Sequence, residues 1–461
     1  MTPLGIKIKR CDSMSVSRGG FSSRLGFIMA AAGSAVGLGN IWGFPTQTAS
    51  NGGAAFVLVY LVLAFCLAYP AFMAELLIGR YGQANAVSSM QKMSRNLWQK
   101  RFAFFVGFGG ILCATLILSF YGILAGWMMS YAIEPIARIV GLTEVSSWLT
   151  SQSIARNLVF NALFMMLTIA IIRRGVEEGI EKWSKRLMPM LIGLLILLII
   201  YVFTLDGSKE GFEAYLNPDI SRIFEPDLLI SALGQAFFSL SLGTSVMVIY
   251  GSYVAKNENL VTLGAQVTLI DVSIAFLAGL LIIPAMYVAQ AQGVAIFAED
   301  GSLISGPNLV FDVLPTLFNS MGAIGLFVAF GFFVLMSIAA LTSSISMLEG
   351  PVSYVVERHN VERKKATTLI GMTILALSAL IIFNFDLLFG LVISLSTVYG
   401  QPLIAMLCCV FVGWIWHRNE LLAEIKEGND NVENSLFWKI WPWYTKFVCP
   451  VAIGAVFIHS L

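Results

Sequence analysis

The chain has 461 residues, of which 57% are hydrophobic and only 12% are charged, and its formal net charge at pH 7 is +1. A soluble protein of this length could not bury so much apolar surface, so the composition excludes an ordinary water-soluble protein. The near-neutral charge also indicates no nucleic-acid partner.

Apolar runs long enough to cross a bilayer recur along the chain, because a hydrocarbon core of roughly 30 Å needs about 20 helical residues. Eleven spans are predicted, at residues 25–47, 54–80, 103–134, 157–173, 187–205, 229–250, 260–290, 322–350, 366–384, 388–415 and 437–461. The first run follows a basic tail and lacks a clean cleavage site, so we expect a retained span rather than a signal peptide. The sequence therefore predicts an all-α integral membrane protein.

Lysine and arginine collect in alternate connections, and short cytoplasmic loops hold an excess of both. The basic segments are the tail at 1–24 and the loops after the second, fourth and eighth runs, whereas the loops at 206–228 and 291–321 are acidic on balance. We therefore expect the tail and the loop at 416–436 to be cytoplasmic and the loop at 206–228 to be extracellular. The carboxyl terminus would then lie outside a bacterial inner (plasma) membrane.

The first span is interrupted by glycines in the stretch AAAGSAVGLGNIWGFP, residues 30–45. Non-helical backbone at membrane depth is tolerated only where it packs in protein or lines a cavity. Freed carbonyls can bind a cation, and the amides of the following half-helix can bind an anion. The alternative is that the glycines only let a neighbouring helix pack closely.

A second interruption favours the binding-site interpretation. The sixth span places hydroxyl residues and a glycine together at its hydrophobic centre, within GQAFFSLSLGTSVMVIYGSY, residues 234–253. The two breaks lie at corresponding places in two sets of five spans, 25–205 and 229–415, which start on opposite sides of the membrane. This arrangement is typical of secondary transporters built from inverted repeats, with the span at 437–461 as an addition.

Four motifs carry a resemblance to a known family: SRLGFIMAAAGSAVGLGNIWGFP, NGGAAF (51–56), GQAFFSLSLG (234–243) and ALTSSISM (340–347). They resemble the neurotransmitter:sodium symporter family, in particular its eleven-span bacterial amino-acid transporters. The resemblance implies a 5+5 inverted-repeat fold with discontinuous spans 1 and 6. It also implies symport of one amino acid with two sodium ions by alternating access.

Two sodium sites follow from the resemblance, and oxygen donors suit a hard cation. The second site would use the side-chain hydroxyls of Thr342 and Ser343. Backbone carbonyls would complete it, namely those of Ala339, Gly33 and Val36. The alternative is that these hydroxyls only bond back to their own helix. The first site would use the Ala35 carbonyl, Asn40, Ser239, Asp271 and the substrate carboxylate. Asp271 is a fixed carboxylate near the positions where some relatives bind chloride, so we expect chloride independence.

The resemblance also assigns a substrate pocket. The amides at Leu38 and Gly39 and the Tyr121 hydroxyl would hold a carboxylate, while Ala35, Phe238, Thr244 and Ser241 would meet the ammonium group. The distal pocket would be lined by Ile117, Phe238, Thr244, Ser343 and Met347. Amine transporters of the family carry an aspartate where this chain has Gly37, which favours an amino acid with a small, neutral or hydrophobic side chain.

Supporting and gating roles complete the expectations. The usual charged external gate is missing, because its arginine position is Gly43 and its aspartate position falls near Phe389, so closure would rely on Phe238 over Tyr121. Glu75 would support the broken sixth span, and Arg24 would latch the tail on the cytoplasmic side. Two rivals remain: a proton-coupled transporter of the same fold and a non-transporting amino-acid sensor. No catalytic constellation indicates an enzyme, and substrate identity and oligomeric state stay open.

Overall fold

The computed structural model describes residues 19–297, 303 and 309–459, so most of the tail and the acids Glu299 and Asp300 lie outside the described residues. Helices dominate, and one isolated bridge joins Phe297 to Leu303. The α-helices are α1 (Arg24–Ala35), α2 (Phe44–Ser50), α3 (Ala54–Leu63), α4 (Tyr69–Gly82), α5 (Ala86–Met93), α6 (Leu97–Ile139), α7 (Thr143–Thr150), α8 (Ile154–Ile172), α9 (Lys182–Phe203), α10 (Ser208–Leu216), α11 (Pro226–Ser239), α12 (Val246–Gly251), α13 (Leu260–Ala291), α14 (Leu314–Ser320), α15 (Ala323–His359), α16 (Arg363–Phe383), α17 (Phe385–Ile393), α18 (Gln401–Val410), α19 (Arg418–Lys426), α20 (Leu436–Trp443) and α21 (Cys449–His459).

Several of these helices are joined end to end by π-helical turns, so one membrane span can contain two α-helices. The π-helical turns are Gly39–Gly43, Ala64–Ala68, Val176–Glu181, Leu309–Val313, Ser394–Gly400, Phe411–Ile415 and Tyr444–Val448, and short 3₁₀ turns occur at Ile220–Arg222 and Val432–Asn434. Within the described residues, nine continuous helical segments are long and apolar enough to span a membrane. A tenth is the pair α1 and α2, which bends by 52° at its break.

The remaining predicted span consists of α11 and α12, each too short to cross a bilayer by itself. All eleven predicted runs therefore coincide with helices, and the prediction of an all-α membrane protein is confirmed. Several helices are longer than their apolar runs. For example, α6 begins at Leu97, capped by Asn96, and continues to Ile139, whereas the run covers only 103–134. The helix extends beyond the hydrocarbon, where charged residues are tolerated.

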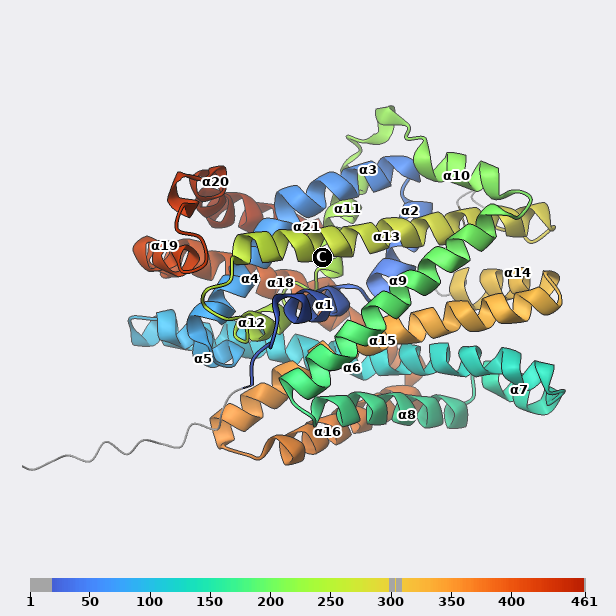
Figure 1. Cartoon of the computed structure of the whole chain (residues 1–461), viewed down its shortest axis with the longest axis horizontal. Helices are drawn as coiled ribbons and strands as arrows, with labels where there is room; N and C mark the ends of the chain where they lie inside the picture. Colours follow the sequence, from blue (N-terminus) through green and yellow to red (C-terminus); the bar gives the residue numbers. More distant parts are fainter. Residues whose placement is uncertain (1–18, 298–302, 304–308, 460–461) are drawn as a thin grey trace, which may run out of the picture.

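The two broken spans lie in the interior of the bundle (Figure 1). The short helices α1 and α12 occupy its centre, while the long helices α6, α13 and α15 run along its length. Helix α1 packs against α9, α13 and α15, and the most extensive contact between helices joins α6 to α15. These two are the third and eighth spans, which correspond to each other in the two proposed repeats, so they form a scaffold beside the breaks.

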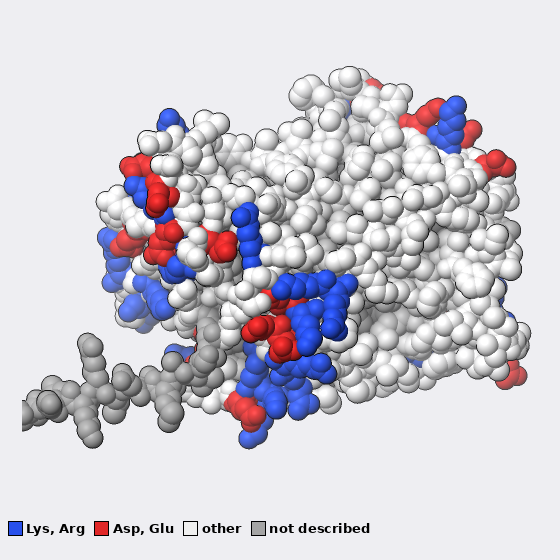
Figure 2. All heavy atoms as spheres, viewed as in Figure 1, with Lys and Arg blue, Asp and Glu red and all other residues white. Residues whose placement is uncertain are grey.

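Charged side chains are scarce along the middle of the molecule (Figure 2). Lysine and arginine gather toward the end where α5, α19 and the start of α9 lie, and fewer are visible at the end formed by α7 and α10. The white band between the two ends is surface without charged side chains, as expected for surface that faces lipid. This distribution matches a helical bundle that spans a bilayer along its long axis.

Candidate functional site

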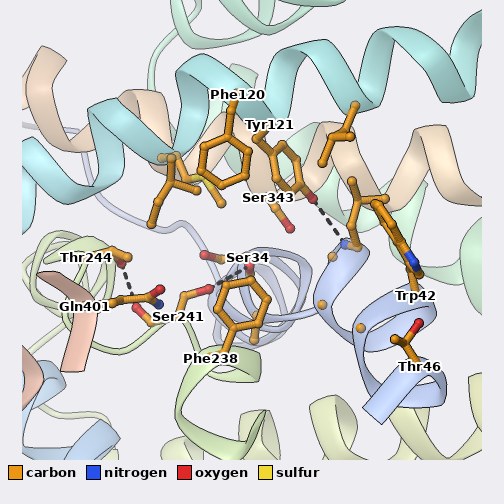
Figure 3. A pocket seen from close by; sticks show the side chains of 18 of the residues that line it. Ser34, Trp42, Thr46, Phe120, Tyr121, Phe238, Ser241, Thr244, Ser343 and Gln401 are labelled. Atoms are coloured by element: carbon orange, nitrogen blue, oxygen red, sulfur yellow. Dashed lines mark hydrogen bonds between the residues drawn. The ribbon is translucent and has the colours of Figure 1, made fainter. Parts of the chain in front are cut away.

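A cavity of about 260 Å³ lies between the two breaks (Figure 3). Its volume is just below the roughly 300 to 1,000 Å³ that is common for drug-sized ligands, which suits a ligand of amino-acid size. All ten residues that the sequence assigned to the substrate pocket line it: Ala35, Leu38, Gly39, Ile117, Tyr121, Phe238, Ser241, Thr244, Ser343 and Met347. The structure therefore brings together residues from four spans of the chain.

The first break has partners for its freed backbone groups. Helix α1 ends before Val36, which adopts an extended conformation. The amide of Gly37 donates to Oδ1 of Asn40 (3.2 Å), and the amide of Leu38 donates to the hydroxyl of Tyr121 (3.2 Å). Because unpaired peptide groups are costly at membrane depth, these contacts stabilise the interruption. They also direct the amide of Leu38 toward the cavity.

The second break, residues 240–245, depends on one glycine and one carboxylate. Gly243 has a φ of +78°, and a Cβ at this position would lie 1.9 Å from the carbonyl oxygen of Gln401, so only glycine fits. Its amide donates to Oε1 of the buried Glu75 (2.7 Å). This contact is the backbone support that we expected from Glu75. The other carboxylate oxygen, Oε2, has no hydrogen-bond partner among the described residues.

The oxygens of the expected second sodium site lie together. The Ser343 hydroxyl donates to the carbonyl of Val36 (3.1 Å) and approaches that of Gly33 (3.5 Å). The Thr342 hydroxyl donates to the carbonyl of Ala339 (2.9 Å) within its own helix. The Ser343 hydroxyl thus joins span 8 to two carbonyls of span 1, and the expected ligands belong to the neutral oxygen class that suits sodium.

The expected first sodium site is joined by direct hydrogen bonds. The Asn40 amide donates to Oγ of Ser239 (2.8 Å) and to Oδ1 of Asp271 (2.7 Å), and Ser239 donates to Oδ2 of Asp271 (2.7 Å). All three side chains are buried, and Ala35 lines the cavity. Among the described residues no three His, Cys, Asp or Glu side chains cluster as metal ligands. A cation here would therefore rely on mixed oxygen donors.

The residues that match positions where some relatives bind chloride are Tyr60, Gln235, Ser239 and Ala275, and Ser239 belongs to this cluster. The Tyr60 hydroxyl donates to Oγ of Ser239 (3.3 Å), and Ser239 in turn donates to the Asp271 carboxylate. The amide of Gln235 donates to the carbonyl of Gly39 (2.9 Å), and Ala275 is fully buried. The negative charge beside Tyr60 and Ser239 is thus carried by the Asp271 side chain of the protein itself.

Gly37 lies at a crowded point of the cavity wall. A Cβ at this position would lie 2.5 Å from Oγ of Ser343 and 2.9 Å from the hydroxyl oxygen of Tyr121. No side chain larger than glycine therefore fits without displacing these two groups. The aspartate that amine transporters carry here would have no room in this pocket.

Aromatic side chains contact Phe389, the position near which the aspartate of the charged gate is missing. Phe389 stacks on Phe385 with ring centroids 4.4 Å apart and meets the cavity residue Phe120 edge to face at 6.0 Å. Phe238 is 37% exposed and makes no ring contact with Tyr121 among the described residues, so its ring lies across the cavity from Tyr121 (Figure 3). The expected closure of Phe238 over Tyr121 would require this ring to move.

The other end of the broken spans is closed by the first described residues. Phe21 packs edge to face against Tyr250 and Tyr253, with ring centroids 5.6 and 6.2 Å apart. The Tyr253 hydroxyl donates to the buried Glu349 (2.6 Å), which also pairs with Arg363 (2.5 Å). These contacts tie the tail to spans 6, 8 and 9.

The guanidinium of Arg24 donates to the amide oxygen of Gln266 in α13 (3.0 Å) at an exposed position, and its role as a latch stays a prediction. The tail is also held by Glu181. Its carboxylate accepts hydrogen bonds from the amide and hydroxyl of Ser22 (2.7 and 2.8 Å) and from the hydroxyl of Ser23 (2.8 Å). Arg24 begins α1, and its hydrogen bond joins this end of the helix to α13.

The sequence did not identify several cavity residues. These are Ser34, Trp42, Thr46, Gln47, Phe120, Leu124 and Gln401. Gln401 lies between Gly400 and Pro402 at the start of α18, where the pattern indicates only a helix irregularity. An unusual polar residue in an apolar span was the one available signal.

A sequence model described as the Sodium:neurotransmitter symporter family matches residues 18–158 and 150–461. An uncharacterized sodium-dependent transporter, YhdH, of Bacillus subtilis (strain 168) is 34% identical over 457 residues, covering 96% of this chain and 97% of that protein. An uncharacterized sodium-dependent transporter of Haemophilus influenzae is 33% identical over 474 residues, covering 96% and 98%.

A more distant relative and a solved structure are also similar to this chain along most of its length. The sodium- and chloride-dependent taurine transporter of Bos taurus is 25% identical over 509 residues, covering 96% of this chain and 78% of that protein. The crystal structure of MhsT in complex with L-phenylalanine superposes with a TM-score of 0.81 at 37% identity, covering 96% of this chain and 100% of that chain. The architecture of MhsT is therefore also that of this protein.

Proposed function

The chain belongs to the sodium:neurotransmitter symporter family, and from this premise we propose that it imports one neutral amino acid with two sodium ions by alternating access. Spans 1 and 6 would rock against the scaffold of spans 3 and 8, and the sodium gradient would drive import. The amino-acid class is supported by the L-phenylalanine bound in MhsT and by the lack of space for a side chain at Gly37.

One observation carries the proposal: the Ser343 hydroxyl on span 8 points at the carbonyls of Val36 and Gly33 freed by the first break. A cation bound there would hold spans 1 and 8 together, so ion binding would be coupled to the position of span 1. The test is uptake of the twenty standard amino acids into proteoliposomes with and without an inward sodium gradient, with mass spectrometric identification. Accumulation only with sodium supports symport, whereas sodium-dependent binding without accumulation would support the sensor.

We expect uptake to be independent of chloride. The Asp271 carboxylate lies beside Ser239, so a mobile anion is not needed to balance the sodium charge. Replacing external and internal chloride with gluconate should leave the uptake rate essentially unchanged. Asp271→Asn should lower uptake in gluconate, with partial recovery in chloride. Uptake by the wild type that collapses in gluconate would contradict this expectation.

We expect an aromatic gate to replace the charged one. Phe238→Ala removes the ring that faces Tyr121 across the cavity and should lower the uptake rate by about tenfold or more, since an open site loses substrate contacts. Asp386→Asn changes an exposed side chain and should have little effect. Uptake rates of both variants, normalised to the protein incorporated, provide the comparison. The opposite ranking would indicate a charged gate at Asp386.

The topology is part of the same proposal. Residues 25–205 and 229–415 would form the two inverted repeats, with the amino terminus cytoplasmic and the carboxyl terminus outside a bacterial plasma membrane. The positive charge near α5, α19 and the start of α9 supports this orientation (Figure 2). The pairing of the buried Arg80 with Glu424 (2.7 Å) also supports it, because it joins the cytoplasmic end predicted for span 2 to the loop at 416–436.

A further inference from the structure

Gln401 offers the cavity a polar group that the protein leaves unpaired. Its side chain is only 4% exposed and lines the cavity. Its amide oxygen, Oε1, is buried and has no hydrogen-bond partner among the described residues. In Figure 3 the amide points into the cavity beside Thr244 and Ser241. A buried acceptor without a donor is costly, so the site is incomplete until a donor arrives.

The position of Gln401 indicates which part of a ligand it would meet. The Leu38 amide and the Tyr121 hydroxyl, which suit a carboxylate, lie at one end of the cavity. Gln401 and Thr244 lie at the opposite end (Figure 3). An amino acid whose carboxylate occupies the first end would therefore direct its side chain toward Gln401.

The neighbouring groups do not supply the missing donor. The Thr244 hydroxyl already donates to the carbonyl of Ser241 (2.6 Å), and that of Ser241 approaches the carbonyl of Ser34 (3.4 Å). Both hydroxyl hydrogens are thus directed at backbone carbonyls. A ligand at this end of the cavity would therefore meet the unpaired Gln401 oxygen beside hydroxyls whose hydrogens are already engaged.

We propose that Gln401 is a specificity-determining residue that selects neutral amino acids whose side chains carry a hydrogen-bond donor. The donor would be a hydroxyl, an amide or a ring N–H, and amino acids with apolar side chains of the same shape would bind less tightly. The inference rests on the proposed function and narrows its substrate class. An apolar side chain would bury Oε1 unpaired, whereas a donor would satisfy it.

The test measures sodium-dependent binding of three matched pairs to purified protein: threonine and valine, glutamine and methionine, and tyrosine and phenylalanine. For the pair whose size fits best, the donor-bearing amino acid should bind more tightly than its apolar partner, by a factor of about ten or more. Gln401→Met should remove this preference by weakening the donor-bearing member, and Gln401→Glu, which keeps an acceptor, should retain it. Thr397→Val is the matched control, because that hydroxyl bonds to Ile393 (2.7 Å) in the same span and does not line the cavity.

The outcomes separate this inference from the function on which it rests. If the wild type binds the apolar member of every pair as tightly as its partner, Gln401 does not select for a donor, although symport would stand. This wild-type comparison decides the matter even where Gln401→Met fails to fold. If no amino acid binds in a sodium-dependent way, the proposed function itself is contradicted.

Discussion

We expect the double variant Thr342→Ala/Ser343→Ala to lose sodium-driven uptake. Ser343 approaches two carbonyls freed by the first break, and Thr342 lies beside the Ala339 carbonyl, so the change removes two of five oxygens from the expected site. Each lost hydroxyl should weaken sodium binding by about 10- to 100-fold, as is common for hydrogen-bonding groups that face a charge. Uptake at several sodium concentrations measures the effect.

The control for this variant is Ser337→Ala on the same helix, α15. The Ser337 hydroxyl donates to the carbonyl of Phe333 (2.8 Å) and does not line the cavity, so sodium dependence should remain normal. If the double variant keeps the wild-type sodium dependence while folded, the hydroxyls only bond within the protein. In that case the second sodium site would lie elsewhere.

The second large effect is expected for Gly37→Ala. The new methyl group would lie 2.5 Å from Oγ of Ser343 and 2.9 Å from the Tyr121 hydroxyl oxygen, so both side chains would have to move. These displacements disturb the second sodium site and the carboxylate end of the cavity together. Sodium-dependent amino-acid binding should fall by about tenfold or more, as measured with a radiolabelled substrate.

Gly193→Ala provides the matched comparison, because an added Cβ at this position in α9 meets nothing within 4 Å. We expect its binding and expression to match the wild type. Normal binding by Gly37→Ala would show that the first break can shift to accept a side chain. The exclusion of amines by lack of space would then not hold.

The architecture could be predicted because it depends on strong local signals. Long apolar runs set the spans, and glycines together with hydroxyl residues marked both breaks. Four motifs indicated the family, which the family match then confirmed. Several pocket residues followed because the motifs fix positions such as Leu38 and Ser241 within the two broken spans, which must face each other. The roles assigned to these residues stay predictions.

The rest depends on which face of each helix turns inward, which a single sequence does not determine. Gln401 belongs to no recognisable motif, and its importance arises only because span 10 directs it toward Thr244. The contact of Glu181 with the tail was missed for a related reason. Glu181 and Ser22 are 159 positions apart, so their contact depends on tertiary packing and leaves no local pattern.

The central claim is that the sodium gradient drives accumulation. The most direct measurement is the internal concentration of the identified amino acid in proteoliposomes under two conditions. The first is an inward sodium gradient without a pH gradient, and the second is an inward proton gradient without sodium. The account predicts accumulation above the external concentration in the first condition and only equilibration or no uptake in the second. Accumulation driven by protons alone would contradict it and would assign the chain to proton-coupled transport.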